Sequence, residues 1–230
     1  MKIAILTGAG ISAESGLGTF RDVDGLWTKY DLEEVATPEG FARNPALVHA
    51  FYNARRANCI SAAPHAAHVA LARLKKSHHD LTLITQNIDD LHERAGSTNV
   101  IHMHGEIMQA LCAACDHRWP APREMSPNGT CPACAEATTR PDIVWFGEVP
   151  YHMDRLMEAV SGCDLFVAIG TSGEVYPAAG LVDLATETGA DTLEINLEAS
   201  SRASAFARAI FGPASQTVPA WVDDIVAQSR

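Results

Sequence analysis

The segment KIAILTGAGISAESG (residues 2–16) joins a short apolar run to a glycine-rich turn and a stretch of small residues. A run of branched apolar residues that stops at glycines is typical of a buried β-strand followed by a tight turn. The residues after the turn suit a helix. The segment therefore predicts a strand, a turn and a helix, which is the opening unit of a parallel α/β sheet.

The glycines of this unit also suit a phosphate site, because Gly8 and Gly10 let backbone N–H groups approach a phosphate at a helix N-terminus. The usual dinucleotide fingerprint has a third glycine where Ala13 stands, and an acidic residue at the end of a second strand about 20 residues on. Here that distance falls on FRDVDGLW (20–27), which is typical of a loop. A simple hydride-transferring dehydrogenase is therefore disfavoured. A nucleotide held in another pose and a tight turn without a ligand both stay open.

Four further apolar runs predict strands, and the segments between them carry helical periodicity. We expect two helices between Asn44 and Ser77, separated at Pro64, and one in NIDDLHERAG that ends at Gly96. Another should follow residue 170 and run to about Thr188. The expected strands are LTLIT (81–85), NVIHMH (99–104), CDLFVAIG (163–170) and DTLEIN (191–196). Strands that alternate with helices indicate a parallel α/β sheet.

Two segments interrupt this α/β pattern. Residues 30–78 form a helical insertion between the first two strands. Between Gly105 and Arg140 the residues Cys, Pro, Gly and Ala dominate, and both helical and strand periodicity are lost. We expect the two insertions, 30–78 and 105–140, to form one small domain. Residues 1–29, 79–104 and 141–230 would form the large domain.

Four of the six cysteines form two close pairs, Cys112-Ala-Ala-Cys115 and Cys131-Pro-Ala-Cys134, with fifteen residues between the pairs. Two Cys-x-x-Cys knuckles can place four thiolates around one Zn²⁺. Because four thiolates close the coordination sphere, the zinc should be structural. The alternative is two chance pairs or redox thiols.

Polar residues recur where the predicted strands end. They stand in TQNIDD (85–90), in GTS (170–172) and at Asn196 and Glu198. Open α/β sheets bind ligands in the crevice outside the carboxyl ends of their strands. Asn87 and Asp89 in the first group could equally cap the helix that follows. Their shared location is therefore more informative than any single motif.

Two side-chain pairs raise further hypotheses. His102 and His104 share a strand face, and a neutral imidazole at a domain junction can accept a proton near neutral pH. FYNARR (51–56) lies in a predicted helix, where Tyr52 and Arg55 stand three apart and so share a face. Taken alone, these residues are as well explained by core or solvated side chains.

Charge and hydropathy argue against several classes. The chain has 17 basic and 28 acidic residues and a net charge of −11, which is a poor match for nucleic-acid binding. The N-terminal apolar run is too short for a secretory signal, and no stretch approaches the roughly 18 apolar residues of a membrane span. We therefore expect a cytoplasmic protein that has no membrane or nucleic-acid partner.

Taken together, the ordered motifs resemble those of the sirtuins, which are NAD-dependent protein-lysine deacylases. This chain departs from the family pattern at Gly18, since many members carry proline directly before the TFR motif (19–21). The departure puts no chemistry in doubt. The resemblance covers nearly the whole chain and is carried by GAGISAESG (8–16), TFR (19–21), TQNID (85–89), HG (104–105), the paired Cys-x-x-Cys, WFGE (145–148), GTS (170–172) and INLE (195–198).

The resemblance implies a Rossmann-like large domain beside a small domain made of a helical part and a zinc ribbon. NAD and an acylated lysine would enter the cleft between them from opposite sides. The zinc ligands would be Cys112, Cys115, Cys131 and Cys134. The positions that match the family's NAD site are Gly8, Ala9, Gly10, Ser12, Ala13, Glu14, Thr19, Phe20, Arg21, Trp27, Gln86, Asn87, Ile88, Asp89, Gly170, Thr171, Ser172, Asn196, Leu197, Glu198 and Ala214.

The implied reaction releases nicotinamide and transfers the acyl group to the ribose, giving O-acyl-ADP-ribose and free lysine. His104 matches the catalytic base, and Asn87 and Asp89 would complete the catalytic set. Val144, Trp145 and Phe146 would form an apolar wall for the substrate.

In bacterial and mitochondrial members that resemble this chain around FYNARR, Tyr and Arg at this spacing read an acyl group that ends in a carboxylate. Tyr52 and Arg55 match both positions. A guanidinium can grip a carboxylate bidentately, and a phenol adds one donor. We therefore expect the removal of succinyl, malonyl and also acetyl groups.

Two other functions deserve comparison. A mono-ADP-ribosyltransferase would use the same NAD site and would leave ADP-ribose attached to a protein. A zinc-ribbon module that binds nucleic acid is disfavoured by the net charge, since the insert has only Arg118, Arg123 and Arg140 as basic residues.

Overall fold

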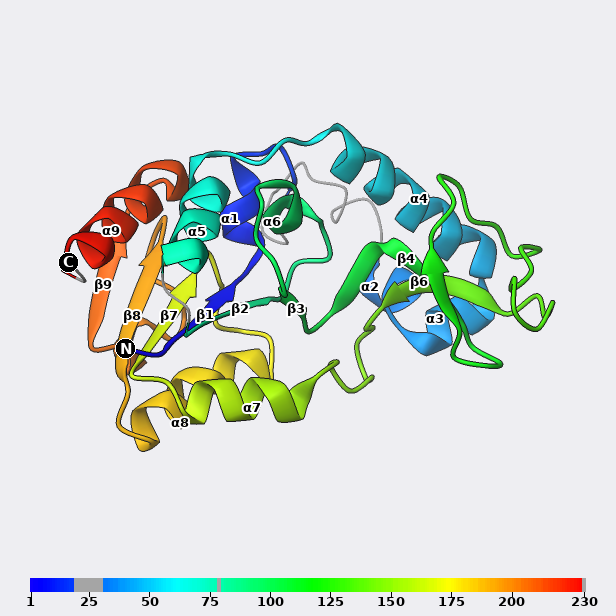
Figure 1. Ribbon diagram of the computed structural model, residues 1–230. Helices are drawn as coiled ribbons and strands as arrows, with labels where there is room; N and C mark the ends of the chain where they lie inside the picture. Colours follow the sequence, from blue (N-terminus) through cyan, green and yellow to red (C-terminus); the bar gives the residue numbers. More distant parts are fainter. Residues whose placement is uncertain (19–30, 78–79, 229–230) are drawn as a thin grey trace.

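The computed structural model describes residues 1–18, 31–77 and 80–228, which form a larger and a smaller lobe (Figure 1). The elements are β1 Ile3–Thr7, α1 Ala9–Ala13, α2 Leu32–Val35, α3 Pro38–Arg43, α4 Pro45–Ser61, α5 Ala66–Ser77, β2 Leu81–Thr85, α6 Leu91–Arg94, β3 Ile101–His102, β4 Gly105–Cys112, β5 Arg118–Pro120, β6 Thr139–Ile143, α7 Met153–Ser161, β7 Leu165–Ile169, η2 Ala178–Gly180, α8 Leu181–Glu187, β8 Asp191–Asn196, η3 Ala203–Ala205, β9 Arg208–Phe211 and α9 Ala214–Gln228.

The larger lobe is built on a six-stranded sheet in the order β3-β2-β1-β7-β8-β9. Every neighbouring pair is parallel, and β1 pairs level with both β2 and β7 along its whole length. The carboxyl ends of these strands therefore meet at one edge of the sheet. This confirms the predicted Rossmann-like parallel sheet.

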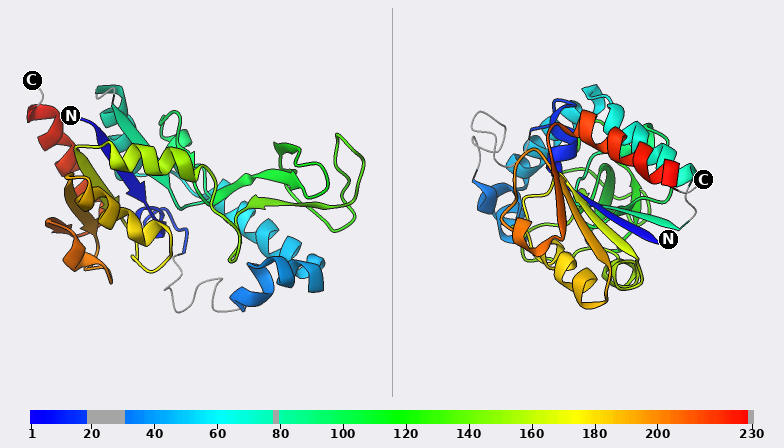
Figure 2. Two further views of the ribbon diagram at one scale, coloured as in Figure 1. Left: turned by 90° about the horizontal axis from the view of Figure 1, so that it is seen from below. Right: turned by 90° about the vertical axis from the view of Figure 1, so that its left-hand side faces the viewer.

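Helices cover both faces of the sheet, so its central strands are buried on both sides. Ile3 and Ile5 of β1 pack in one core with α5 and α9, whereas Ala4 and Leu6 pack in a second core with α7 and α8. Figure 2 shows α5 and α9 on one side of the sheet and α7 and α8 on the other. This arrangement explains why β1 reads as a continuous apolar run.

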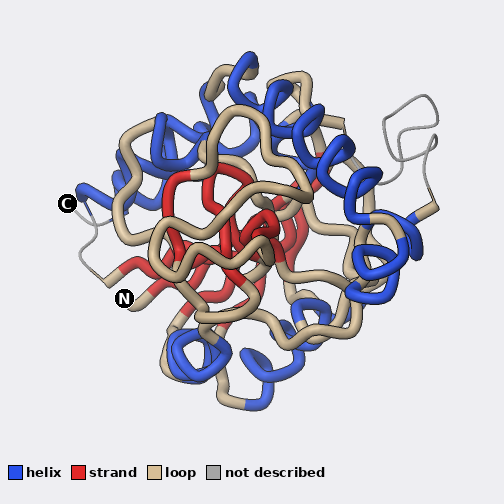
Figure 3. Tube along the Cα trace, turned by 90° about the vertical axis from the view of Figure 1, so that its right-hand side faces the viewer, coloured by secondary structure: helices blue, strands red, loops and turns tan. Residues whose placement is uncertain are grey.

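The smaller lobe combines helices α2, α3 and α4 with the antiparallel sheet β5-β4-β6. Figure 3 views the molecule from this side, with strands central and helices around them. Val48, Phe51 and Tyr52 of α4 pack against Ile107 and Trp145 from the sheet side. The small domain with a helical part and a β part is thus as predicted.

The strands of this lobe were not visible in the sequence pattern. The register of β4 against β6 shifts between Glu106 and Ala110, and such a bulge breaks the regular inward and outward alternation. β5 has only three residues and is largely exposed. The expected domain boundary at residue 140 falls within β6.

The predicted elements of the larger lobe agree in part with the structure. β2 and β8 coincide with LTLIT and DTLEIN, and α4 and α5 are separated around Pro64. In NVIHMH only two residues form β3. β9 had no counterpart among the expected strands, because this edge strand is mostly exposed and its apolar run is only three residues long.

Candidate active site

The order of the large sheet creates a switch point between β1 and β7, where the chain proceeds to strands on opposite sides. Ligands of such sheets bind in the crevice outside the carboxyl ends at this point. The expected cofactor residues follow four of these ends: 8–14 after β1, 86–89 after β2, 170–172 after β7 and 196–198 after β8. The fold thus gathers them along one edge.

Three glycines bring the turns after β1 and β7 into backbone contact. A Cβ at Gly8 would lie 2.7 Å from the carbonyl oxygen of Gly170, and one at Gly10 would lie 2.8 Å from the Gly170 Cα. Gly170 has φ +63°, and its own Cβ would overlap the backbone nitrogen of Ile11. These glycines therefore join two turns across the switch point, a use that the sequence could not separate from phosphate contact.

Ser12, Asn87 and Asp89 form a buried polar group beside this contact. The Asn87 amide donates to the Gly8 carbonyl and to the Ser12 hydroxyl, both at 3.1 Å. The Ser12 hydroxyl donates to Asp89 Oδ2 at 3.0 Å. Burial raises the pKa of Asp89. The second Asp89 oxygen accepts from the Leu91 N–H at the start of α6, so Asp89 both joins this group and supports the helix.

His104 lies at the junction of the two lobes. Its Nδ1 is 3.0 Å from the carbonyl oxygen of Gln86. Because a carbonyl only accepts, the Nδ1 carries the proton and Nε2 holds the free electron pair. Burial lowers the pKa of His104. The imidazole is therefore neutral near pH 7 and able to accept a proton.

His102 has a different environment, although the sequence presented it as a similar residue. Its Nδ1 contacts the Asn87 carbonyl at 3.2 Å, and its Nε2 lies 3.0 Å from Glu93 Oε1. Burial lowers the pKa of His102, but the Glu93 carboxylate outweighs burial and the pKa is raised. His102 supports the turn that carries Asn87 and has no free ring nitrogen.

The ends of β7 and β8 are tied together by side chains. The Asn196 amide donates to the Thr171 carbonyl at 2.8 Å and to Glu194 Oε1 at 3.3 Å. Ser172 lies on the same turn, and its carbonyl accepts from Ser201. Leu197 and Glu198 are exposed.

Ala214 opens α9 and lies near the end of α1. Its neighbour Ser215 donates its backbone N–H to Glu14 Oε1 at 2.9 Å. Glu14 is exposed; burial raises its pKa, but the hydrogen bonds from Ser215 together outweigh burial, and the pKa is lowered. This contact joins the first and last helices of the larger lobe.

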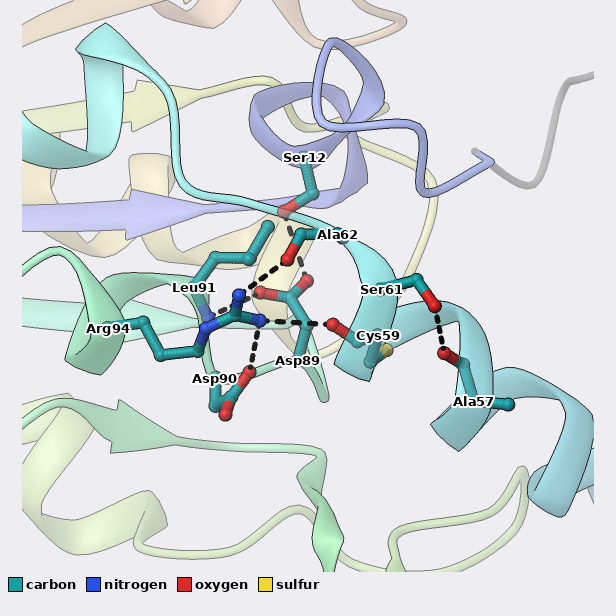
Figure 4. A network of polar contacts seen from close by, with 9 residues as sticks. All are labelled: Ser12, Ala57, Cys59, Ser61, Ala62, Asp89, Asp90, Leu91 and Arg94. Atoms are coloured by element: carbon teal, nitrogen blue, oxygen red, sulfur yellow. Dashed lines mark hydrogen bonds and ion pairs between the residues drawn. The ribbon is translucent and has the colours of Figure 1, made fainter.

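Arg94 of α6 connects the cofactor edge to the helical part of the smaller lobe. Its guanidinium donates to the Cys59 carbonyl at 3.1 Å, to the Ala62 carbonyl and to Asp90. Figure 4 shows these bonds beside the Ser12–Asp89 contact. The C-terminal end of α4 is thereby held against the segment that follows β2.

Tyr52 and Arg55 share a face of α4, as their spacing predicted. The Arg55 guanidinium carbon lies 5.9 Å from the centre of the Tyr52 ring. Burial lowers the pKa of Arg55, and the nearby Tyr52, Cys59 and Asp89 raise it. Arg55 is therefore within electrostatic reach of Asp89.

Arg56, the next residue, serves the fold of the smaller lobe. Its side chain is buried and donates to the Ile107 carbonyl at 2.8 Å and to Asn53 Oδ1 at 2.9 Å. Asn53 in turn holds both backbone groups of Met125, at 2.8 and 2.9 Å. The sequence analysis singled out Arg55 and assigned no role to Arg56, because the partners of Arg56 come from segments distant in sequence.

The three expected wall residues differ in exposure. Trp145 is buried and donates its indole N–H to the Tyr52 hydroxyl at 3.0 Å. Val144 donates its backbone N–H to the His104 carbonyl. Phe146 is half exposed, and its N–H donates to the Ala36 carbonyl.

Arg140 and Glu148 support the wall, although neither was predicted to belong to the site. The two form a bidentate ion pair at 2.7 and 2.9 Å, and Glu148 also accepts from the Trp145 backbone N–H. Glu148 could have been found from the sequence, because it is the glutamate of the WFGE motif (145–148). Its arginine partner lies in the cysteine-rich insert, where charge alone suggested nothing.

The cysteines converge as their spacing predicted. The four Sγ atoms of Cys112, Cys115, Cys131 and Cys134 lie within 4.8 Å of one another. The Sγ–Sγ distance is 3.6 Å between Cys112 and Cys134 and 3.8 Å between Cys115 and Cys131. A tetrahedral Zn²⁺ with Zn–S bonds of about 2.3 Å separates its sulfurs by about 3.8 Å. The set therefore fits zinc.

Thr19, Phe20, Arg21 and Trp27, which the resemblance also assigned to the cofactor, lie outside the described residues. Within the described ranges, no helix has the length and apolar character needed to cross a membrane.

A model of the Sir2 family matches residues 8–177. The chain belongs to the Sir2 family. The match confirms the sirtuin resemblance and spans the switch point, both insertions and the His104 junction.

Relatives and solved structures agree with this assignment. The NAD-dependent protein deacylase of Caulobacter vibrioides is 57% identical over 233 residues, covering 99% of this chain and 98% of the relative. A Sir2 homologue crystallised with NAD has a TM-score of 0.91 and 38% identity, covering 99% of this chain and 90% of that one. A Sir2 variant in complex with a deacetylated p53 peptide and 3′-O-acetyl ADP-ribose has a TM-score of 0.82 and 27% identity, covering 99% and 93%.

The structural match to Sir2 homologues extends beyond the family model. Residues 178–228, with β8, β9 and α9, complete the sheet edge that carries Asn196 and Ala214. The Sir2 fold therefore accounts for both lobes.

Proposed function

We propose that this Sir2 protein is an NAD-dependent protein-lysine deacylase that removes succinyl and malonyl groups and also acetyl groups. The observation that carries the proposal is that the segment after β2 interacts with both His104 and Arg55. Gln86 hydrogen-bonds the neutral His104, and Asp89 lies within electrostatic reach of Arg55. A proton acceptor and a cation on the acyl side thus converge on one segment.

The residues at the switch point fit NAD. Gly8 to Glu14, Gln86 to Asp89, Gly170 to Ser172, Asn196 to Glu198 and Ala214 would hold it, together with the expected residues of the 19–27 segment. When bound, NAD supplies the ribose to which the acyl group is transferred. The buried Ser12, Asn87 and Asp89 side chains already order one another, which favours a site with little reorganisation on binding.

His104 would act as the general base. With Nδ1–H fixed on the Gln86 carbonyl, its Nε2 can take a proton from a hydroxyl of the bound cofactor. Asn87 and Asp89 would orient the groups around it. General base catalysis of this kind contributes about 10²–10⁴-fold.

Tyr52 and Arg55 would bind the far end of the acyl chain. A succinyl or malonyl carboxylate accepts hydrogen bonds from both the guanidinium and the phenol. An acetyl group offers the half-buried Arg55 no carboxylate, so it lacks the charge-assisted hydrogen bond that a succinyl group can form, which costs binding free energy by comparison. The attraction between Arg55 and Asp89 offsets part of that cost, so we expect acetyl groups to be removed as well.

The remaining assignments follow the same scheme. Val144, Trp145 and Phe146 would line the entry of the lysine, and the protein substrate would lie across Phe146, whose ring is half exposed. One structural Zn²⁺ would be held by the four cysteines of the ribbon. The large domain would comprise residues 1–29, 79–104 and 141–230, and the small domain 30–78 and 105–140.

The test is direct. The purified protein is incubated with NAD and a peptide that carries succinyl-lysine, with an acetyl-lysine peptide in parallel, and products are identified by mass spectrometry. We expect free lysine peptide, nicotinamide and O-acyl-ADP-ribose in equal amounts. The absence of these products from both peptides, or ADP-ribose attached covalently to protein in their place, would contradict the proposal.

A further inference from the structure

We propose that Trp145 is a positioning residue that sets selectivity for acyl groups ending in a carboxylate, because its indole N–H fixes the Tyr52 hydroxyl as a proton donor. The inference rests on the proposed deacylase function and adds a residue that acts through Tyr52.

The direction of the Trp145–Tyr52 hydrogen bond follows from the chemistry of its two groups. An indole nitrogen only donates, so the Tyr52 oxygen is the acceptor in this 3.0 Å contact. Among the described residues, the structure gives the Tyr52 hydroxyl no acceptor for its own proton. Tyr52 is 2% exposed, and burial raises the pKa of its phenol, so the proton stays on the oxygen near neutral pH.

This arrangement matches a carboxylate and does not match an acetyl group. A carboxylate offers only acceptors, whereas the methyl end of an acetyl group offers none. The guanidinium carbon of Arg55 lies 5.9 Å from the Tyr52 ring, one helical turn away on the same face. With the Tyr52 oxygen turned toward Trp145, its proton is available to a ligand oxygen beside Arg55.

The indole itself is held in place from several sides. The Arg140 guanidinium carbon lies 3.5 Å from the Trp145 ring centre, and Glu148 grips both Arg140 and the Trp145 backbone N–H. The Phe41 ring packs on the same indole with centres 5.1 Å apart. Trp145 is 2% exposed, so its N–H has few orientations to choose from and stays aimed at Tyr52.

The experiment uses Trp145→Phe, which keeps an aromatic wall and removes the N–H. The kcat/KM is measured with succinyl-lysine and acetyl-lysine peptides for the wild type, Trp145→Phe, Tyr52→Phe and the double variant. We expect the succinyl-to-acetyl ratio to fall about 3- to 10-fold in Trp145→Phe, as one oriented hydrogen bond warrants. Phe41→Leu removes one packing contact but keeps the N–H and the Arg140 and Glu148 contacts that hold the indole, so its ratio should match that of the wild type.

The double variant separates positioning from packing. If Trp145 acts through the Tyr52 hydroxyl, Trp145→Phe should not change the ratio further once Tyr52 is phenylalanine. An unchanged ratio in Trp145→Phe alone, or an equal additional fall in the double variant, would overturn the inference. A wild-type protein that acts on neither peptide would instead contradict the proposed function. Thermal unfolding of each variant identifies any change that comes from lost stability.

Discussion

At the scale of single residues, we expect the replacement of Arg55 to separate acyl selectivity from catalysis. Arg55→Met removes the charge while keeping much of the apolar stem. We expect the succinyl-to-acetyl ratio of kcat/KM to fall by about 10- to 100-fold, since hydrogen bonds to charged groups contribute roughly 1.5–3 kcal/mol. Steady-state kinetics with the two peptides measures this ratio.

Two comparisons sharpen the Arg55 experiment. Arg55→Lys keeps a charge but not the planar fork, so it should recover only part of the ratio. Arg43→Met makes the same change on α3, where the arginine is exposed and contacts the Glu33 carbonyl, and should leave the ratio as in the wild type. An equal loss of both activities in Arg55→Met would show that Arg55 supports the fold instead.

His104 predicts the pH dependence. Burial lowers its pKa below the ordinary value of about 6.5, and the base works only when unprotonated. The kcat/KM, which reports the free enzyme, should therefore be flat above pH 7 and should fall with a midpoint below 6.5. His104→Tyr should abolish this activity while keeping the thermal unfolding transition. A midpoint above 6.5 would assign the limb to another group, such as His102.

The residues of the candidate site could be proposed from sequence where short motifs carry them. Gly8, Asn87 and His104 stand in segments whose chemistry is local, so the pattern is informative. The bond between Trp145 and Tyr52 joins residues 93 positions apart, and no local pattern encodes such a contact. Similarly, adjacent arginines in FYNARR differ in role only because α4 turns one toward Asp89 and the other toward Ile107.

At the scale of elements, Asn53 connects α4 to the zinc-ribbon part through both backbone groups of Met125, and it also accepts from Arg56. Asn53→Ala leaves these partly buried groups unpaired. We expect the free energy of unfolding to fall by about 2–4 kcal/mol, since each unsatisfied group costs about 1–3 kcal/mol and water recovers part. Denaturant titration measures the loss.

Asn58 provides the matched control for this element. It lies on the same helix and is exposed, its backbone carbonyl accepts from the Ala62 N–H, and its side chain has no hydrogen-bond partner among the described residues. Asn58→Ala should change the free energy of unfolding by no more than about 0.5 kcal/mol. If the two substitutions have equal effects, Asn53 contributes helix propensity alone and does not tie the two parts together.

The predictability of elements follows their burial. β2 and β8 are nearly fully buried, so their apolar runs mark their ends closely, and Pro64 marks the break between α4 and α5. β4 contains a bulge, and β9 is an exposed edge strand, so neither shows a clean period. Their places are set by contacts with β6 and β8, which are distant in sequence and therefore invisible to a local pattern.

At the scale of the whole molecule, the two lobes meet where the segment after β2 touches both. Arg94 of α6 donates to the Cys59 carbonyl of α4, and the Ile107 N–H of β4 donates to the Ile88 carbonyl. Hydrogen bonds thus connect α4, the sheet of the smaller lobe and the segment after β2. A change in the ribbon can for this reason reach Tyr52 and Arg55 through α4.

The buried histidines make the stability of the molecule depend on pH. Burial lowers the pKa of His68 to about 3 and that of His92 well below its ordinary value. In the unfolded chain both titrate near 6.5, so the unfolded state binds more protons below that pH. Each should cost about 1.4 kcal/mol of stability per pH unit as pH falls below 6.5, until the folded pKa is reached.

One histidine works in the other direction, and a variant separates the effects. The raised pKa of His102 adds stability below pH 6.5 that is lost as pH rises through its folded pKa. In the wild type, His68 Nδ1 accepts from the His65 backbone N–H at 3.4 Å. His68→Asn keeps an acceptor for this N–H and removes one titrating group. The free energy of unfolding, measured with denaturant at pH 7.5, 6.5 and 5.5, should fall less steeply with decreasing pH in His68→Asn than in the wild type, with the difference in slope approaching one proton near pH 5.5. Equal slopes would mean that His68 becomes protonated without unfolding, with its ring reaching water through a local opening beside His92.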